Sequence, residues 1–472
     1  MITKEQFEAM QKEKSLFYII EEMEGDDVTP VLLYSRLEGT EKFLFESSLI
    51  HEEKGRYSFL GSNPYAEVKS RGKHVTIVTE HGTEHREQKV LDVALELLSF
   101  AEIESPFPFA GGAIGYIGYD VIRQYEILGE INADQQGMPE AHLLFYKTFV
   151  VFDHKFQKVS IVYVYREDDR LSYEEIHRVI ERIKKQLFIP APIAAIETGL
   201  EGHFTSNVTQ QQFQEMVEKA KEYIQAGDIF QVVLSQRLQT SFEGNPFGLY
   251  RRLRVTNPSP YMFYVDFGSY VVLGSSPESL LSVKGRKVTT NPIAGTRPRG
   301  ATKEEDNSIA KELLGDEKEK AEHLMLVDLG RNDVGYVSEF GSVEVEKFME
   351  IERYSHVMHI VSEVTGTLRE NVTCLDALKK CLPAGTVSGA PKIRAMTIID
   401  ELESVKRGVY SGTVGYISFN GDMDMALAIR TMVVKDQKAY IQAGAGIVYD
   451  SNPENEYHET LNKAKALLEV LK

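Results

Sequence analysis

The stretch QAGAGIVYDSNPENEYHETLNK, residues 442–463, places the strongest constraint on the fold and chemistry of this chain. Its apolar, glycine-containing first half predicts a strand, and the turn-forming letters DSNP predict where that strand ends. A helix is expected next, with Glu456 and Glu459 three positions apart on one face and Lys463 one turn further along that face. Such carboxylates usually form a solvated face. The bare backbone N–H groups of the neighbouring glycines favour a ligand site instead.

A second pair of carboxylates, Glu319 and Glu322, has the same spacing in DEKEKAEHLMLVDLGRND. If the fold brings both pairs together, four negative charges repel one another, and a divalent cation is needed to hold them. An oxygen-only donor set without a Cys or His cluster favours Mg²⁺. Spacing alone does not establish that the pairs meet, so the Mg²⁺ site is an expectation.

The composition predicts a soluble globular protein. With 472 residues, 42% hydrophobic and 26% charged, the chain is expected to form two domains or one large composite. A net charge of −18 argues against nucleic acids and anionic membranes as partners. The sequence contains neither a membrane-length apolar stretch nor a signal peptide. Two cysteines without metal-type spacing, Cys374 and Cys381, predict buried thiols in a reducing cytoplasm.

Apolar runs and turn signals predict an α+β fold in two parts, residues 1–190 and 204–472, divided by a proline-containing stretch between Ile189 and Phe204. Strands are expected at 31–34, 42–45, 57–60, 74–78, 148–152, 159–165, 231–239, 261–267, 270–273, 280–283, 287–291, 409–420, 424–435 and 438–448. Helices are expected at 91–100, 173–187, 209–226, 303–329, 372–380 and 392–402, and at the C-terminus. Thr209 is the expected N-cap of one helix, and Gly227 its stop.

Some polar residues stand in patterns that suit an anionic ligand. Gly295 and Thr296 are flanked by Arg297 and Arg299 in NPIAGTRPRG, which fits a carboxylate substrate. Arg430 lies in the apolar run ALAIRTMVV, where a buried guanidinium needs an anionic partner.

Other candidates are less specific. Glu278 follows a proline between two expected strands, where a lone Glu is usually solvated. His356 and His359 lie near an alternating strand, where a structural histidine is the more common outcome. The glycines of PFAGGAIGYIGYD, residues 108–120, indicate close packing of a sheet, because no phosphate-loop lysine follows them.

Six strings of this sequence occur together in one known family: PIAGTR, EKAEH, DLGRND, SHVMHI, PAGTVSGAPK and GAGIVYDSNPENEY. On these strings the chain resembles the chorismate-utilising enzymes, and most closely the large (synthase) components of anthranilate synthases. The resemblance extends over essentially the whole chain and is strongest from about Phe204 to Leu471. It implies a large antiparallel β-sandwich with peripheral helices. Residues 1–190 would form a regulatory subdomain, and residues 204–472 the chorismate-binding catalytic domain.

The resemblance implies roles for individual residues. Mg²⁺ would be held by Glu322 and Glu459 directly, with Glu319 and Glu456 beside them, and would neutralise the ring carboxylate while ammonia attacks C2. The positions that match the family's substrate contacts are Gly295, Thr296, Tyr410, Arg430, Gly444, Ala445, Gly446 and Lys463. Arg430 suits the enolpyruvyl carboxylate of chorismate.

Two further residues match acid–base positions of the family. Glu278 matches the general acid that protonates the departing 4-hydroxyl, and His359 matches the histidine associated with the later elimination of pyruvate. Hydroxide is a poor leaving group, so cleavage of this C–O bond needs a nearby proton donor. A Glu with a raised pKa can supply the proton.

Gln231 and Ala294 distinguish branches of the family. Relatives that add water have a lysine base in place of Gln231, whereas ammonia needs no such base. Relatives that make 4-amino-4-deoxychorismate have a nucleophilic lysine in place of Ala294. Both residues favour the anthranilate branch. The runner-up is the aminodeoxychorismate synthase component of folate synthesis, against which Ala294 and the string FLFES both count.

The source of ammonia implies a partner. No glutaminase signature is present, and neither cysteine lies in a glycine-flanked turn. We therefore expect a separate glutamine amidotransferase subunit, in a heterotetramer of two large and two small subunits that makes anthranilate for tryptophan biosynthesis.

Two strings resemble the family's tryptophan-binding site. FLFESS contains Ser47, with Phe45 where leucine is usual, and NPSPYMFY contains Pro260, Tyr261 and Met262. Together they favour feedback inhibition by tryptophan, although FLFES alone reads equally as a sheet edge. An alternative function from a different class is a tryptophan-sensing protein that has lost catalysis. The intact set of catalytic residues argues against it.

Overall fold

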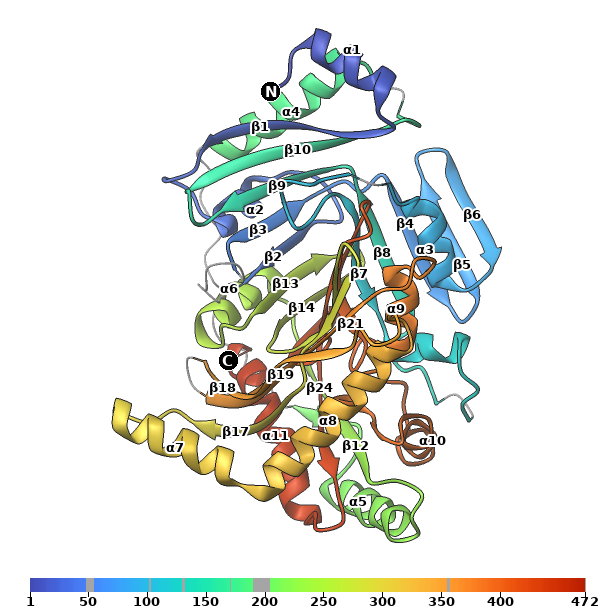
Figure 1. Cartoon of the computed structure of the whole chain (residues 1–472), viewed down its shortest axis with the longest axis vertical. Helices are drawn as coiled ribbons and strands as arrows, with labels where there is room; N and C mark the ends of the chain where they lie inside the picture. The colour runs from blue at the N-terminus through green and yellow to red at the C-terminus, as the bar shows by residue number, and fades with distance from the viewer. Residues whose placement is uncertain are drawn as a thin grey trace.

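Two large antiparallel sheets pack on each other and are surrounded by helices in the computed structural model, which describes residues 1–47, 55–101, 103–129, 132–169, 171–189, 204–354 and 357–471 (Figure 1). Within these residues each sheet has twelve strands. The expected α+β class and the antiparallel β-sandwich with peripheral helices are confirmed. No described helix is both long and apolar enough to cross a membrane.

The elements have the following bounds. Sheet A has the order β1 (Leu16–Glu24), β10 (Lys158–Arg166), β9 (Thr148–Asp153), β3 (Tyr57–Gly61), β2 (Phe43–Glu46), β13 (Tyr261–Asp266), β14 (Tyr270–Ser276), β23 (Thr431–Lys435), β24 (Lys438–Ile447), β12 (Gln231–Ser241) and β11 (Thr205–Ser206), with β20 (Gly389–Ala390) also pairing β12. Sheet B has the order β17 (Ile293–Pro298), β19 (Val357–Thr367), β16 (Lys287–Thr290), β15 (Ser279–Lys284), β22 (Met423–Leu427), β21 (Thr413–Ser418), β7 (Gly112–Ile117), β8 (Ala141–Tyr146), β4 (Ala66–Arg71), β5 (His74–Thr79) and β6 (Gly82–Glu87), with β18 (Glu344–Arg353) pairing β19. The helices are α1 (Lys4–Glu13), α2 (Pro30–Arg36), α3 (Val90–Leu98), η1 (Tyr119–Gln124), α4 (Tyr173–Phe188), α5 (Gln210–Gln225), α6 (Pro246–Thr256), α7 (Lys303–Gly315), α8 (Glu317–Gly335), α9 (Cys374–Cys381), η2 (Gly385–Val387), α10 (Lys392–Leu402) and α11 (Pro453–Val470).

Strands from both predicted parts of the chain are hydrogen-bonded in both sheets. In sheet A, β2 pairs with β13 and sets Glu46 opposite Met262. In sheet B, β7 pairs with β21 and sets Gly115 opposite Gly415. The two parts therefore share their sheets. The division near residue 190 stays a prediction, and the boundary stretch, residues 190–203, lies outside the described residues.

Sheet A is apolar on both faces, which explains continuous runs such as VSIVYVY in β10. Val162 and Val164 belong to the core between the two sheets. Ile161 and Tyr163 belong to a second core, which includes residues of α2, α4 and α6. The close packing expected at the glycines of β7 is also present, because a Cβ at Gly115 would lie 2.0 Å from the carbonyl oxygen of His142.

Local sequence signals predicted most helices correctly. Helix α5 has Thr209 as its N-cap, and Gly227 follows with a φ of +83°. The strand expected at 31–34 is wrong, because those residues lie in α2. Thr29 accepts a hydrogen bond from the backbone N–H of Leu32, and Pro30 occupies the first turn. The helical region expected at 303–329 contains two helices, α7 and α8, which meet at Asp316, the N-cap of α8.

Candidate active site

Helices α8 and α11, which contain the two acidic pairs, pack against strands of the two sheets (Figure 1). Helix α11 packs on β24, and α8 packs on β17 and β19. Elements separated by more than 100 residues in the sequence therefore contribute to one region.

One carboxylate of each acidic pair is influenced by the same two lysines. Burial and then the charge of Glu319 raise the pKa of Glu322, while Lys463 and Lys318 act in the opposite direction. Burial, followed by the charge of Glu459, raises the pKa of Glu456, and the same two lysines again oppose the shift. Gln231 donates a hydrogen bond of 3.3 Å to Glu322. Glu322 of α8 and Glu456 of α11 thus share two cationic neighbours, and the convergence of the two pairs stays a prediction.

The donor set suits a hard divalent cation, because carboxylate oxygens predominate, although Arg297 and Lys463 already form ion pairs with Glu319 and Glu459. In the described part of the chain, no three His, Cys, Asp or Glu side chains already stand close enough together to hold a metal ion. The ligand set Glu319, Glu322, Glu456 and Glu459 stays a prediction.

Lys463 joins α11 to the glycine-containing end of β24. Its Nζ donates a hydrogen bond of 3.0 Å to the carbonyl oxygen of Gly444 and lies 2.6 Å from Oε1 of Glu459. A Cβ at Gly444 would lie 2.6 Å from the hydroxyl oxygen of Tyr410, and a Cβ at Gly446 would lie 2.7 Å from Nε2 of Gln231. The backbone oxygen of Leu234, 2.8 Å from a Cβ at Gly444, leaves little room for a side chain there, whereas at Gly446 only the end of a flexible side chain is close; Ala445 lies between the two glycines in β24.

A bulge in β17 presents the next group. The β17–β19 register shifts between Ala294 and Thr296, and Gly295 has a φ of +66°, a conformation that favours glycine. His359 lies opposite Thr296, and its Nδ1 is 3.1 Å from both the Thr296 hydroxyl and the Gly295 carbonyl oxygen. Burial lowers the pKa of His359, which favours the neutral imidazole. His356 lies outside the described residues.

Glu278 lies between β14 and β15 and is partly buried. Burial raises the pKa of its carboxyl group to about 7, although a hydrogen bond from Thr386 and the charge of Lys463 oppose this shift. The Thr386 hydroxyl donates this bond over 2.9 Å. Glu278 can therefore hold a proton near neutral pH, as a general acid must. Thr386 was missed in the sequence, although it stands in the family string PAGTVSGAPK.

Three arginines behave differently from expectation. Arg430 precedes β23 instead of lying within a strand, and it has a φ of +50°. No described carboxylate forms an ion pair with Arg430, although Tyr410 and Glu459 lie near enough to oppose the lowering of its pKa by burial. Arg297 and Arg299 were expected to suit a substrate carboxylate. Instead, Arg297 pairs with Asp316 and Glu319, and Arg299 pairs with Asp306.

The two strings expected to bind tryptophan lie on adjacent strands. Ser47 directly follows Glu46, which is opposite Met262 in the β2–β13 pair, while Pro260 and Tyr261 stand at the start of β13. Residues 48–54 lie outside the described residues.

Sequence reasoning missed the helix behind these strands. Tyr250 of α6 donates a hydrogen bond of 2.7 Å to Glu46, and Arg254 of the same helix lies 3.0 Å from Glu46. Tyr250 and Arg254 are four residues apart, a spacing that places both on one face of a helix and that the sequence displays.

Comparison with known proteins identifies the family of this chain. The family model described as chorismate binding enzyme matches residues 43–469. The anthranilate synthase component 1 of Acetivibrio thermocellus is 47% identical, over 99% of this chain and 98% of the relative, and that of Lactococcus lactis is 45% identical, over 96% and 99%.

Solved structures extend the comparison. The crystal structure of anthranilate synthase component I from Streptococcus pneumoniae superimposes with a TM-score of 0.82 at 46% identity, covering 95% of this chain and 99% of that one. The menaquinone-specific isochorismate synthase of Escherichia coli shares the fold alone, with a TM-score of 0.75 at 20% identity over 99% of this chain and 98% of the other. The chain therefore belongs to the chorismate-binding enzymes and, within them, to the anthranilate synthase component 1 family.

Proposed function

We propose that this chain converts chorismate and ammonia into anthranilate, pyruvate and water, as the synthase component of a two-component anthranilate synthase. The relatives named as component 1 support this assignment, and so does the amine branch indicated by Gln231 and Ala294. The observation that carries the chemistry is Glu278, a partly buried carboxyl group with its pKa raised to about 7.

The residues of the site divide the reaction between them. Glu278 donates its proton to the 4-hydroxyl, so the C–O bond breaks with loss of water while ammonia forms a C–N bond at C2. Arg430, with no described carboxylate as ion-pair partner, binds the enolpyruvyl carboxylate. His359, held by Thr296 and Gly295, lies where it can assist transfer of the C2 proton as pyruvate leaves and the ring becomes aromatic.

Gly444, Ala445 and Gly446 bring the backbone of β24 close to the substrate, and Tyr410 and Lys463 position it. The carboxylates Glu319, Glu322, Glu456 and Glu459 would hold Mg²⁺, which when bound would supply positive charge to neutralise the ring carboxylate of chorismate.

Two further features belong to the proposal. Ammonia comes from a separate glutamine amidotransferase subunit, in line with the name component 1 of the relatives. Tryptophan inhibits by binding where β2 meets β13, beside Ser47, Pro260, Tyr261 and Met262, which joins residues more than 200 positions apart in one ligand site.

The test uses the purified chain with chorismate, Mg²⁺ and an ammonium salt, and follows the fluorescence of anthranilate. Product is expected from ammonium but not from glutamine, and an added amidotransferase subunit should restore the use of glutamine. Glu278→Gln should remove the activity, because an amide cannot donate the proton. A different aromatic or non-aromatic product, or turnover of glutamine by the chain alone, would overturn the corresponding part of the proposal.

A further inference from the structure

A small cavity lies beside Tyr410, within the region bounded by β12, β23, β24 and the loop before β8. Its volume, about 20 Å³, has room for about one water molecule. Two arginines belong to its lining, which consists of Gln136, Arg237, Arg407, Val409, Tyr410, Thr431, Val433, Tyr440, Ile441 and Gln442.

Arg237, on β12, is the exceptional member of this lining. The residue is only 4% exposed. Its guanidinium contacts neutral oxygens, donating to the carbonyl oxygen of Lys406 at 3.3 Å and to Oε1 of Gln135 at 2.7 Å. No ion pair with a carboxylate forms among the described residues, and burial lowers the pKa of Arg237, although Tyr440 and the more distant charges of Asp134 and Glu403 oppose this shift. A buried cation without an anion is unfavourable, because the interior solvates charge poorly.

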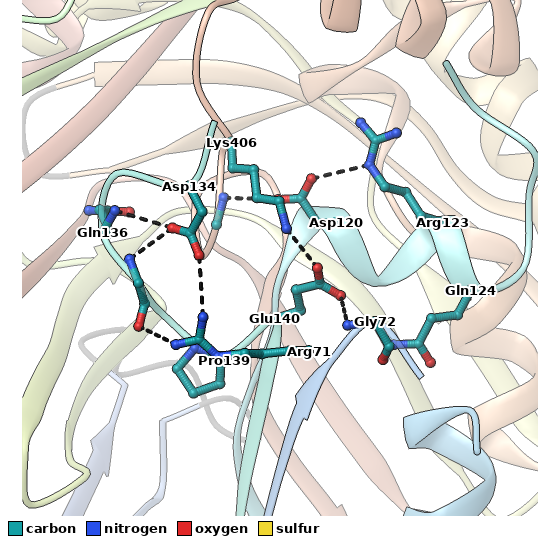
Figure 2. Close-up of polar contacts among 12 residues, drawn as sticks. Arg71, Gly72, Asp120, Arg123, Gln124, Asp134, Gln136, Pro139, Glu140 and Lys406 are labelled. Atoms are coloured by element: carbon teal, nitrogen blue, oxygen red, sulfur yellow. Dashed lines mark hydrogen bonds and ion pairs between the residues drawn. The ribbon is translucent and has the colours of Figure 1, made fainter. Parts of the chain in front are cut away.

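The carboxylates nearest to this guanidinium are engaged by other groups. Arg407, also in the lining, pairs with Glu403 at 2.6 Å. Figure 2 shows the neighbouring loop, where Lys406 bonds Glu140 at 2.9 Å and Glu140 also accepts from the backbone N–H of Gly72.

Asp134 is engaged in the same view. It accepts hydrogen bonds from the backbone N–H groups of Gln136 and Gly137 and lies 3.7 Å from Arg71 (Figure 2). Each of these carboxylates thus has its own partners, and Arg237 is left with neutral oxygens only.

We propose that the cavity binds a small monovalent anion of halide size, with Arg237 as its counter-ion. The charge of Arg237 indicates an anionic ligand. An anion in the cavity would stabilise this buried guanidinium, which pairs with no described carboxylate. Size favours a small ion such as chloride or bromide, since the space has room for about one water-sized particle. Tyr410 also lines the cavity, so the bound ion would help to hold the Tyr410 side chain in place.

The first test is the melting temperature of the full chain during a titration with sodium chloride, with sodium gluconate added to keep the ionic strength constant. Chloride that binds the folded chain should raise Tm in a saturable manner, by about 1–2 °C at a tenfold excess over Kd for a protein of this length. Arg237→Gln should abolish the rise, and Arg237→Lys should retain part of it.

Arg71→Gln, which removes a mostly exposed arginine from the same neighbourhood, is the matched control and should leave the chloride effect intact. If Arg237→Gln does not fold, crystals of the unaltered chain grown without halide and soaked in bromide give an independent reading. An anomalous peak within hydrogen-bond distance of the Arg237 guanidinium is expected. A Tm that does not respond to chloride, a response unchanged in Arg237→Gln, or a cavity that holds only water after the bromide soak would overturn the proposal.

Discussion

The hydroxyl of Thr386 donates a hydrogen bond of 2.9 Å to the carboxylate of Glu278, which precedes it by 108 residues. This bond stabilises the ionised carboxylate, whereas burial stabilises the neutral acid, and burial dominates to give a pKa of about 7. A general acid acts in its protonated form. Activity that depends on Glu278 is therefore present below this pKa and is lost as pH rises through it.

Replacement of Thr386 by valine should move the alkaline limb of the pH–rate profile to higher pH. The substitution removes the hydrogen bond to the ionised form, so the pKa of Glu278 rises further. The measurement is kcat/KM for chorismate between pH 6 and 9, with Thr83→Val on the exposed strand β6 as the control. An alkaline limb that stays in place, or moves to lower pH, would contradict this role.

The acidic pairs should be essential for turnover but not for folding. Glu322→Gln and Glu459→Gln should each reduce kcat/KM by at least about 100-fold, because loss of a direct ligand should exceed the effect of losing a supporting one. Glu317→Gln, on the exposed face of the same helix α8, should leave activity unchanged. Far-ultraviolet circular dichroism checks the fold. Full activity of the unaltered chain in excess EDTA would exclude the metal.

Gly444→Ala should impair the site more than Gly446→Ala. At Gly444 the new methyl group meets the Tyr410 hydroxyl at 2.6 Å and the backbone oxygen of Leu234 at 2.8 Å, and backbone cannot move aside easily. At Gly446 the near neighbour is the end of the Gln231 side chain, which can rotate. Steady-state kinetics of both variants should show the larger loss of kcat/KM for Gly444→Ala. The reverse order would show that Tyr410 and β24 do not approach each other as described.

Replacement of Ser47 by phenylalanine should weaken inhibition by tryptophan and leave uninhibited turnover near that of the unaltered chain. The larger side chain occupies space beside β13, and no catalytic group is removed. Allosteric coupling between such sites is typically about 1–3 kcal/mol, so complete uncoupling should raise the inhibitory concentration several-fold or more. Tryptophan titrations at fixed chorismate, with Ser47→Ala as the control, make the comparison. Equal inhibition of Ser47→Phe and the unaltered chain would show that FLFES is only a strand.

The buried pair Arg407–Glu403 should matter more for stability than exposed pairs do. Arg407 donates to both Glu403 oxygens and to the backbone oxygens of Val233 and Val387. Arg407→Met leaves a buried carboxylate uncompensated and should lower the free energy of unfolding by about 3–5 kcal/mol. Arg331→Met, which breaks an exposed pair with Asp328, should cost about 1 kcal/mol or less. Urea denaturation of both variants measures the difference, and equal losses would contradict it.

Local signals in the sequence determined a large part of the secondary structure. The helix at 392–402 has the bounds that its periodicity predicts, and Thr209 and Gly227 flank α5 as expected. Such features depend on residues within one or two turns of each other, so a single sequence displays them. The misread segment at 31–34 belongs to the same class, since its apolar letters suit a strand while Thr29 and Pro30 signal the start of a helix.

Tertiary structure alone decided which distant segments meet. The spacing of Glu319 and Glu322, or of Glu456 and Glu459, places each pair on one helix face, but only the fold brings Glu322 of α8 and Glu456 of α11 under the influence of the same two lysines, Lys463 and Lys318. The pairing of β2 with β13 follows from the order of strands in sheet A, which no local periodicity encodes. The pKa of Glu278 and the carboxylate-free guanidinium of Arg237 likewise depend on burial and on neighbours far away in the sequence. The residue types in the sequence thus indicated the candidate chemistry. The pKa values and charged neighbours of these residues depend on distances in space, so only the fold decided them.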